Sequence, residues 1–115
     1  MNKREFGNKG EDLACEYLTK NGYEIIERNV HFSKLCEIDI IAKQKDTLIF
    51  VEVKTRKNND FGSPLEAVTK TTYNNIKTGV FSYLQETPVK HKNFRIDIIG
   101  ITLQPKLKIE HLKSI

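Results

Sequence analysis

Residues 36–56 of the chain read CEIDIIAKQKDTLIFVEVKTR. Two runs rich in Ile, Val and Phe, at 37–42 and 47–55, predict two β-strands. The polar segment between them, 44–46, is short, so the two strands are expected to form an antiparallel hairpin. Each strand carries acidic side chains among large apolar ones, and this mixture is the main clue to the fold and to its chemistry.

Side chains alternate across a β-strand, so Glu37 and Asp39 are expected to share one face with Ile41, while Ile38 and Ile40 lie on the other face. The second strand mixes acidic and apolar residues on one face in the same way. A buried carboxylate is costly unless it is paired or bound to a metal. We therefore expect a sheet covered on both faces, with its acidic side chains lining a cleft at one open end.

The hairpin is expected to bring Asp39 and Glu52 together, because they are 13 positions apart and flank the turn. Paired carboxylates suit Mg²⁺, a cation that polarises phosphoryl oxygens and lowers the pKa of bound water. Lys54, on the same face as Glu52, could orient the attacking water or stabilise charge developing on phosphorus. The three residues predict a metal-dependent phosphodiesterase site, but a surface ladder of ion pairs would show the same spacing.

The remaining elements follow from periodicity and from turn-forming residues. They are a helix at 3–21 that stops at Gly22, an edge strand at 23–30, a loop at 56–63, a helix at 64–84, and strands at 94–101 and 106–112. The order αβββαββ describes one α/β domain spanning residues 1–115, with a mixed central sheet. In the second helix we expect Ser63 as N-cap, Pro64 in the first turn, and a kink or break within 69–75.

The composition, 38% hydrophobic and 30% charged over 115 residues, excludes a disordered chain. The net charge of +4 is compatible with nucleic acid but does not require it. No apolar run approaches the roughly 20 residues that cross a bilayer, and no signal peptide is visible, so we expect a cytoplasmic protein without membrane contact. Cys15 and Cys36 are too few for a disulfide framework or a zinc site.

Five motifs together resemble the bacterial YraN family (UPF0102). They are FGNKGEDLA at 6–14, CEIDIIA at 36–42, FVEVKTR at 50–56, FGSPLEAV at 61–68 and RID at 95–97. The resemblance covers nearly the whole chain, and the combination is specific. That family is similar to archaeal Holliday-junction resolvases and other PD-(D/E)xK endonucleases. It therefore implies a restriction-endonuclease-like fold, with a central mixed sheet flanked by helices, and a nuclease activity.

The resemblance also implies roles for individual residues. Asp39 and Glu52 become the ligands of one or two Mg²⁺ or Mn²⁺ ions, and Lys54 becomes the catalytic lysine. Glu11 is similar to the acid on the first helix of such nucleases, which completes the metal or water shell; alternatively it is a favourable acid near a helix start. Glu37 is either a second acid of the site or a solvated group at a strand end.

Two positions depart from the pattern of the family. Cys36 stands where the family usually has Gly, so the chain must enter the acidic strand without the conformational freedom of glycine. Thr72 stands where the family often has a Lys in the second helix. Lys70 could substitute for it, but it lies on a different helical face, which leaves a phosphate contact from this helix in doubt.

Other charged residues are candidates for secondary roles. Arg28, Arg56, Lys57 and Lys70 could bind DNA phosphates around the cleft, or they could be ordinary solubilising charges. Arg95 is expected in a strand near the cleft, where it is more a structural residue than a catalytic one. The three histidines, which are His31, His91 and His111, show no metal-binding spacing and are expected at the surface.

The leading hypothesis is a Mg²⁺-dependent DNA endonuclease that selects branched DNA and acts as a homodimer, because junction cleavage needs two cuts. The rival hypothesis is a non-catalytic module that binds nucleic acid or protein and retains the nuclease fold. A third hypothesis is a subunit that is active only with a protein partner, in which case the chain would bind metal but cut little alone.

Overall fold

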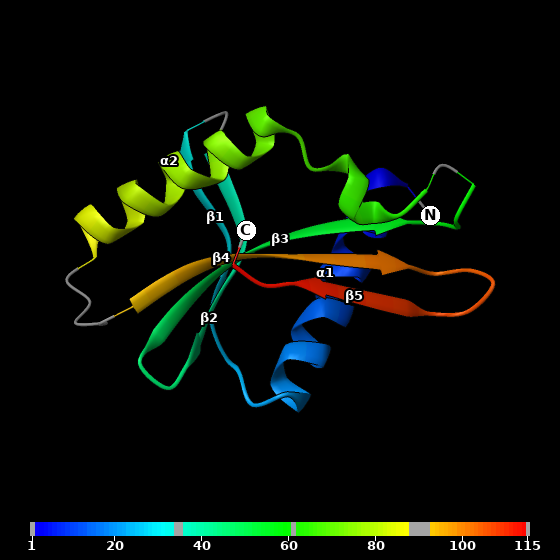
Figure 1. Ribbon diagram of the computed structural model, residues 1–115, viewed down its shortest axis with the longest axis horizontal. Helices are drawn as coiled ribbons and strands as arrows, with labels where there is room; N and C mark the ends of the chain where they lie inside the picture. Colours follow the sequence, from blue (N-terminus) through cyan, green and yellow to red (C-terminus); the bar gives the residue numbers. More distant parts are fainter. Residues whose placement is uncertain (1, 34–35, 61, 88–92, 115) are drawn as a thin grey trace.

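The computed structural model describes residues 2–33, 36–60, 62–87 and 93–114. It contains a five-stranded mixed sheet with helices on both faces (Figure 1). The elements in chain order are α1 (Lys3–Lys20), β1 (Glu24–Ser33), β2 (Cys36–Gln44), β3 (Thr47–Arg56), the 3-10 helix η1 (Pro64–Ala67), α2 (Lys70–Glu86), β4 (Asn93–Thr102) and β5 (Lys108–Leu112). The predicted order αβββαββ and the mixed sheet are confirmed, with η1 as an additional helical turn.

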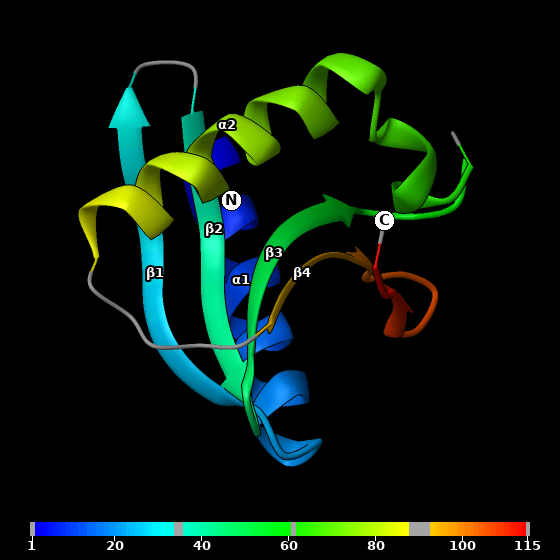
Figure 2. The same cartoon turned by 60° about the vertical axis from the view of Figure 1, so that its left-hand side comes forward.

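The strands lie side by side in chain order, from β1 at one edge to β5 at the other. The predicted antiparallel hairpin of β2 and β3 is present, and so is the predicted edge position of β1. Strands β3 and β4 are parallel, because the chain between them crosses over through η1 and α2. Figure 2 shows the strong twist of the sheet, in which β1 and β2 turn away from β4.

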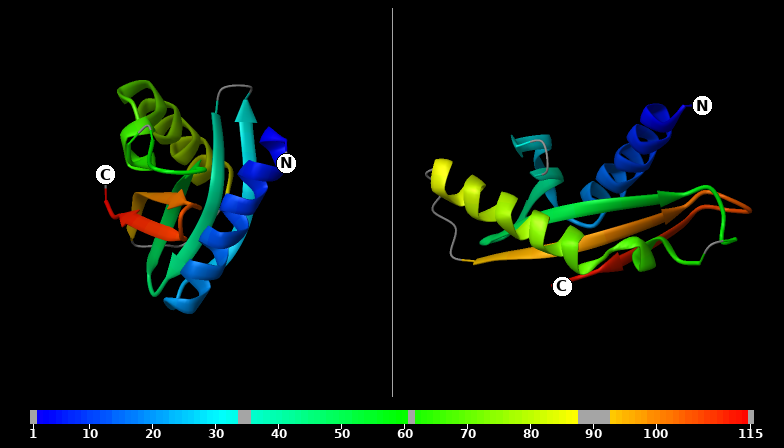
Figure 3. Two further views of the ribbon diagram at one scale, coloured as in Figure 1. Left: turned by 90° about the vertical axis from the view of Figure 1, so that its right-hand side faces the viewer. Right: turned by 90° about the horizontal axis from the view of Figure 1, so that it is seen from above.

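Apolar side chains cover both faces of the sheet, as the two mixed strands predicted. On one face, Leu18 of α1 packs in a core with Val51 of β3. On the other face, Val80 of α2 packs in a core with Phe50 of the same strand. Figure 3 shows the two α-helices on opposite sides of the sheet. Among the described residues, no helix is both long enough and apolar enough to span a membrane.

The second helix is broken, as predicted, but the break falls between Ala67 and Lys70, at the very start of the predicted stretch, and residues 70–75 are helical. Ser63 caps η1 as expected, since its hydroxyl accepts a hydrogen bond from the backbone N–H of Leu65. Thr69 then caps α2 by accepting a bond from the N–H of Thr72 at 3.2 Å. Threonine serves better as a cap than as an interior helical residue, so the chain starts a new helix here.

The predicted alternation in β2 is wrong at one point. Ile38 packs in the core under α2, whereas Ile40 packs in the core under α1, although a regular strand would place both on one face. Asn29 of β1 lies opposite Asp39, between the flanking pairs of the ladder, and has a φ of 53°. Asparagine tolerates this left-handed conformation, so the pleat reverses here, and Asp39 lies at the reversal.

Helix α1 approaches β3 very closely at Gly10. A Cβ atom at position 10 would lie 2.9 Å from the Cβ of Thr55 and would also collide with its hydroxyl. Glycine is therefore needed at this position for packing rather than for backbone conformation. By contrast, a Cβ atom at Gly7 on the same helix would meet nothing within 4 Å. The contact at Gly10 sets how near the next residue, Glu11, can come to the sheet.

We expect Gly10→Ala to lower the free energy of unfolding by about 1–3 kcal/mol, because it overpacks the contact between α1 and β3. Gly7→Ala is the matched control, and we expect it to raise stability by about 0.5–1 kcal/mol through helix propensity. Urea denaturation of the two variants measures both effects. Equal stability changes at the two positions would contradict the close approach at Gly10.

Candidate active site

Asp39 lies where β2 separates from β3. The antiparallel ladder between the strands ends at Ile40 and Val51. One residue beyond, the side chain of Asp39 replaces the missing backbone partner, because its Oδ2 accepts a hydrogen bond from the N–H of Val53 at 2.8 Å. The residue is only 9% exposed. The carboxylate is therefore held by the main chain of the neighbouring strand in a nearly closed environment.

Glu52 and Lys54 follow on β3, beside the point where β2 departs. The Glu52 side chain is 14% exposed and that of Lys54 is 30% exposed. Lys54 Nζ lies 3.7 Å from Glu52 Oε1. The parallel ladder with β4 continues on the other side of β3 through both residues, so the backbone that carries them is held on that side. The structure thus brings Asp39, Glu52 and Lys54 together, as their spacing predicted.

The two carboxyl groups perturb one another. Burial, together with the charge of Glu52 and a hydrogen bond to it, raises the pKa of Asp39 to about 8. Burial also raises the pKa of Glu52. Two adjacent buried carboxylates cannot both stay ionised at little cost, so near neutral pH the pair needs a shared proton or a cation between them.

Glu11 extends this acidic group from α1. Burial, followed by the charge of Asp39, raises the pKa of Glu11. Its Oε1 is buried and makes no hydrogen bond to the part of the chain that the structure describes. Arg28 Nη2 lies 3.6 Å from this atom, but its shorter contact is with Asp12 at 2.9 Å. Glu11 therefore keeps one acceptor atom free for a ligand or a water molecule.

The acidic residues form a suitable donor set for a hard divalent cation. Mg²⁺ commonly takes one or two protein carboxylates and completes its shell with water and phosphate oxygens. Asp39 and Glu52 are such a pair, and burial raises the pKa of both although Lys54 lies beside Glu52. Within the described ranges, no group of three or more His, Cys, Asp or Glu side chains is placed to hold a metal. The site therefore suits a metal ion that takes two protein carboxylates and completes its shell with water.

Of the four basic residues predicted around the cleft, Arg28 reaches one of the acids of the cleft. Its Nη2 lies 3.6 Å from Glu11 Oε1 and 2.9 Å from Asp12 Oδ1. Arg56 ends β3 opposite Thr102. Lys57 lines one mainly apolar cavity, and Lys70 lines another beside α2. Among the described residues, Lys54 is the cation that forms an ion pair with Glu52, at the distance given above.

Glu37 lies two residues before Asp39, and its charge contributes to the raised pKa of both Asp39 and Glu52. It also approaches His31, with Glu37 Oε1 3.7 Å from His31 Nε2. The surface position predicted for His31 is confirmed, since its side chain is 64% exposed. Glu37 is thus a partly exposed acid at the border of the site.

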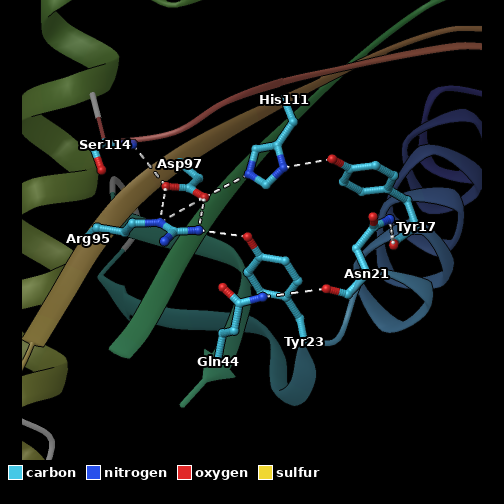
Figure 4. Close-up of polar contacts among 8 residues, drawn as sticks. All are labelled: Tyr17, Asn21, Tyr23, Gln44, Arg95, Asp97, His111 and Ser114. Atoms are coloured by element: carbon cyan, nitrogen blue, oxygen red, sulfur yellow. Dashed lines mark hydrogen bonds and ion pairs between the residues drawn. The ribbon is translucent and has the colours of Figure 1, made fainter. Parts of the chain in front are cut away.

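A second polar cluster lies away from these acids, between α1 and the C-terminal strands (Figure 4). Asp97 of β4 is fully buried, and Arg95 Nε donates to its Oδ1 at 3.0 Å. His111 Nε2 lies 2.7 Å from Asp97 Oδ2, and Tyr17 OH lies 2.9 Å from His111 Nδ1. Arg95 also donates to the hydroxyl of Tyr23 at 2.7 Å. The cluster therefore ties β4 and β5 to α1.

This cluster corrects one prediction and supports another. His111 was expected at the surface, but its side chain is only 5% exposed, because β5 places it under Tyr17 of α1. His91 lies outside the described residues. Arg95 is a structural residue as expected, with its guanidinium occupied by Asp97 and Tyr23. It lies in this second cluster, however, and not near the acidic cleft as expected. Burial would raise the pKa of Asp97, but hydrogen bonds from His111 and Arg95 outweigh burial and lower it.

Sequence reasoning missed a set of residues beside Glu11. A cavity of about 500 Å³ is lined by Lys3, Arg4, Gly7, Asn8, Glu11, Asn29 and Glu37. The spacing along α1 contained a signal, since Arg4, Gly7 and Asn8 precede Glu11 by seven, four and three positions and so share its helical face. The position of Asn29 in this cavity could not be predicted in the same way, because a hydrophobic pattern does not reveal its left-handed backbone conformation.

Fold and site together define an α/β protein with a group of acidic side chains at the junction of two strands. Comparison with known sequences identifies its family. Residues 10–101 match the model of Uncharacterised protein family UPF0102. The chain belongs to this family, as its motifs indicated.

Relatives that carry the name UPF0102 protein match along almost their whole length. The relative from Caldicellulosiruptor saccharolyticus is 44% identical over 109 residues, which cover 95% of this chain and 92% of the relative. The relative from Syntrophomonas wolfei is 43% identical, with 95% of each chain covered. The relative from Dictyoglomus turgidum is 46% identical over 106 residues, covering 92% of this chain and 89% of the relative.

We expect Asp97→Asn to lower the free energy of unfolding by about 3–5 kcal/mol, because it removes the buried charge that pairs with Arg95 and His111. The amide also turns a donor toward groups that themselves donate. Thermal and urea unfolding measure the loss. Asp60→Asn, at an exposed loop position, should change stability little. A loss of similar size in both variants would argue against the buried network.

The raised pKa of Asp39 predicts how the stability of the metal-free protein depends on pH. The folded state holds a proton on this pair that the unfolded chain releases near pH 4, so folding stability falls as the pH rises from about 4 to 8. We expect Asp39→Asn to remove this fall. At pH 8 the variant should be more stable than the wild type by more than about 1.4 kcal/mol, the equivalent of one pKa unit.

Unfolding in EDTA at pH 5 and at pH 8 measures this difference. Near pH 5 the variant should differ little from the wild type, because Asp39 is then protonated in the folded protein. Asp46→Asn, in the exposed turn between β2 and β3, is the matched control and should show the pH profile of the wild type. A destabilised Asp39→Asn variant at pH 8 would show that the carboxylate is well accommodated without a metal.

Proposed function

We propose that this chain is a divalent-metal-dependent endonuclease of the PD-(D/E)xK class, which hydrolyses phosphodiester bonds in DNA and selects branched substrates. The observation that carries the proposal is the meeting of Asp39 and Glu52 with Lys54 beside them. Adjacent, nearly buried carboxyl groups with raised pKa values are typical of functional sites. The mixed sheet, with its acidic hairpin followed by a parallel crossover, agrees with this class.

Asp39 and Glu52 are the residues that would hold Mg²⁺ or Mn²⁺. The chemistry that such an ion supplies when bound is polarisation of a phosphoryl oxygen and activation of water at neutral pH. Asp39 is oriented for this role by the N–H of Val53, which donates to its Oδ2 and fixes the carboxylate beside Glu52.

Lys54 stabilises the charge that develops on the phosphate during hydrolysis. Its Nζ is 3.7 Å from Glu52 Oε1, so the ammonium group stays beside the carboxylate while its other hydrogens remain able to donate. A positive group placed in advance at the reacting phosphate lowers the transition-state free energy without a cost of reorganisation.

Glu11 accepts a hydrogen bond from water in the site through its buried Oε1, which lacks a hydrogen-bonding partner among the described residues. A carboxylate with a raised pKa is suited to receive a proton from attacking water. Cleavage of a branch point requires cuts in two strands, so two copies related by a two-fold axis would act together.

The direct test is cleavage of labelled linear, flapped and four-way DNA with Mg²⁺ or Mn²⁺. We expect the wild type to cut, with a preference for the branched substrates. Asp39→Asn and Lys54→Met should each lower the rate by at least about 100-fold, the scale of removing one preorganised charge-stabilising group. Isothermal titration with Mn²⁺ should show binding to the wild type and to Lys54→Met but much weaker binding to Asp39→Asn.

Lys43→Met and Asp46→Asn are the matched controls, because both residues lie toward the hairpin turn rather than at the acids, and both variants should cut like the wild type. A wild type that binds Mn²⁺ but cuts no DNA would overturn the activity of the isolated chain and support a subunit that needs a partner. Neither metal binding nor cleavage would support the non-catalytic module.

A further inference from the structure

The cavity beside Glu11 differs from the other large cavities of the described protein. It is lined mainly by charged and amide side chains that come from α1, β1 and β2. The cavities beside Lys57 and Lys70 are lined mostly by leucine, valine and aromatic residues. The first turns of α1 contribute Lys3, Arg4, Gly7 and Asn8 to the lining of the polar cavity, and Asn29 of β1 and Glu37 of β2 complete it together with Glu11. Figure 3 shows α1 on the face of the sheet opposite α2. The lining of the polar cavity combines the cations Lys3 and Arg4 and the amides of Asn8 and Asn29 with the acids Glu11 and Glu37. The cationic and amide groups suit an anion such as a phosphate.

The polar cavity adjoins the acidic site through shared and neighbouring residues. Glu11 lines the cavity and carries the buried Oε1 described above. Glu37, also in the lining, precedes Asp39 by two residues on β2. Asn29 lies opposite Asp39 in the ladder between β1 and β2. A polymer that runs through the acidic site can therefore continue into this cavity.

A DNA substrate is a polyanion, so it needs cationic side chains near the acidic site to offset the negative charge there. Glu11, Glu37 and the pair formed by Asp39 and Glu52 are acidic, so the negative charge that they carry repels a phosphate chain. Arg28 is already paired with the acids of α1, so it contributes little additional positive charge. Besides a bound metal and Lys54, the approach of DNA needs further positive groups near the acids.

Lys3 and Arg4 supply these groups. Both are exposed residues of the first turn of α1 that line the polar cavity. Among the described residues, neither takes part in an ion pair, so their charges are available to a ligand. Asn8 and Asn29 add amide groups that can donate hydrogen bonds to phosphate oxygens.

We propose that the cavity lined by Lys3, Arg4, Asn8 and Asn29 is a binding subsite for a DNA backbone phosphate adjacent to the one that is cut. The inference rests on the proposed nuclease function and adds to it the path of the strand beside the acids. Lys3 and Arg4 bind the strand and set its position, and they take no part in the chemical step.

The test is DNA binding measured without cleavage. The probes are fluorescein-labelled four-way DNA and linear duplex DNA, with fluorescence anisotropy recorded in EDTA over a range of salt concentrations. The double variant Lys3→Gln/Arg4→Gln should weaken binding about ten-fold or more near physiological salt. It should also reduce the slope of log Kd against log salt by about 2, the loss of two phosphate contacts.

Lys9→Gln is the matched control, because Lys9 lies on the same helix but lines the apolar cavity beside Lys57. Lys9→Gln should bind DNA nearly as the wild type does, and Arg4→Lys should retain most of the affinity because the charge stays. In cleavage with Mg²⁺, the double variant should show a raised KM with kcat largely retained at saturating DNA.

The outcomes separate the subsite from the nuclease function itself. If the wild type cuts DNA and the double variant binds as tightly as Lys9→Gln, the subsite is overturned and the proposed function stands. If kcat falls while affinity is unchanged, Lys3 and Arg4 act on the chemical step and the positioning role is wrong. If the wild type neither binds nor cuts DNA, both proposals fall.

Discussion

One hydrogen bond, from the N–H of Val53 to the carboxylate of Asp39, lies at the centre of the structure. In a regular hairpin a backbone carbonyl of the neighbouring strand would satisfy such a group. Here β2 reverses its pleat and leaves β3, and an acidic side chain takes the place of the carbonyl. The strands can separate without leaving a buried donor unpaired, and the separation is what places Asp39 next to Glu52.

Asp39 and Asp97 are both buried, but their surroundings shift the pKa of their carboxyl groups in opposite directions. Asp97 receives hydrogen bonds from Arg95, His111 and the backbone N–H of Ser114, and its pKa is lowered. Asp39 has a second carboxyl group as its neighbour, and its pKa is raised. Both are nearly inaccessible to solvent, so burial alone does not distinguish them. The difference lies in whether the protein itself provides the compensating charge, and at Asp39 it does not.

Much of the fold could be predicted from local patterns. The hairpin followed from two β-forming runs around a short polar turn. The low helix propensity of 69–75 indicated a break in the second helix, which falls at the start of that stretch, before Lys70. The pleat reversal could not be predicted, because no residue of β2 itself marks it, and the left-handed backbone of Asn29 across from it is not visible in a hydrophobic pattern. The burial of His111 also escaped prediction, since it arises from packing against Tyr17, 94 positions earlier in the chain.

The bond between Val53 and Asp39 has a spectroscopic consequence. The chemical shift of a backbone amide depends strongly on the charge of the group that it donates to. In a proton–nitrogen correlation spectrum, the Val53 signal will therefore move when Asp39 is protonated and again when a cation binds its other oxygen. The chemical shift of the Val53 amide therefore reports the protonation of Asp39 and the binding of a cation at the acidic site. Both can be followed by titration without DNA.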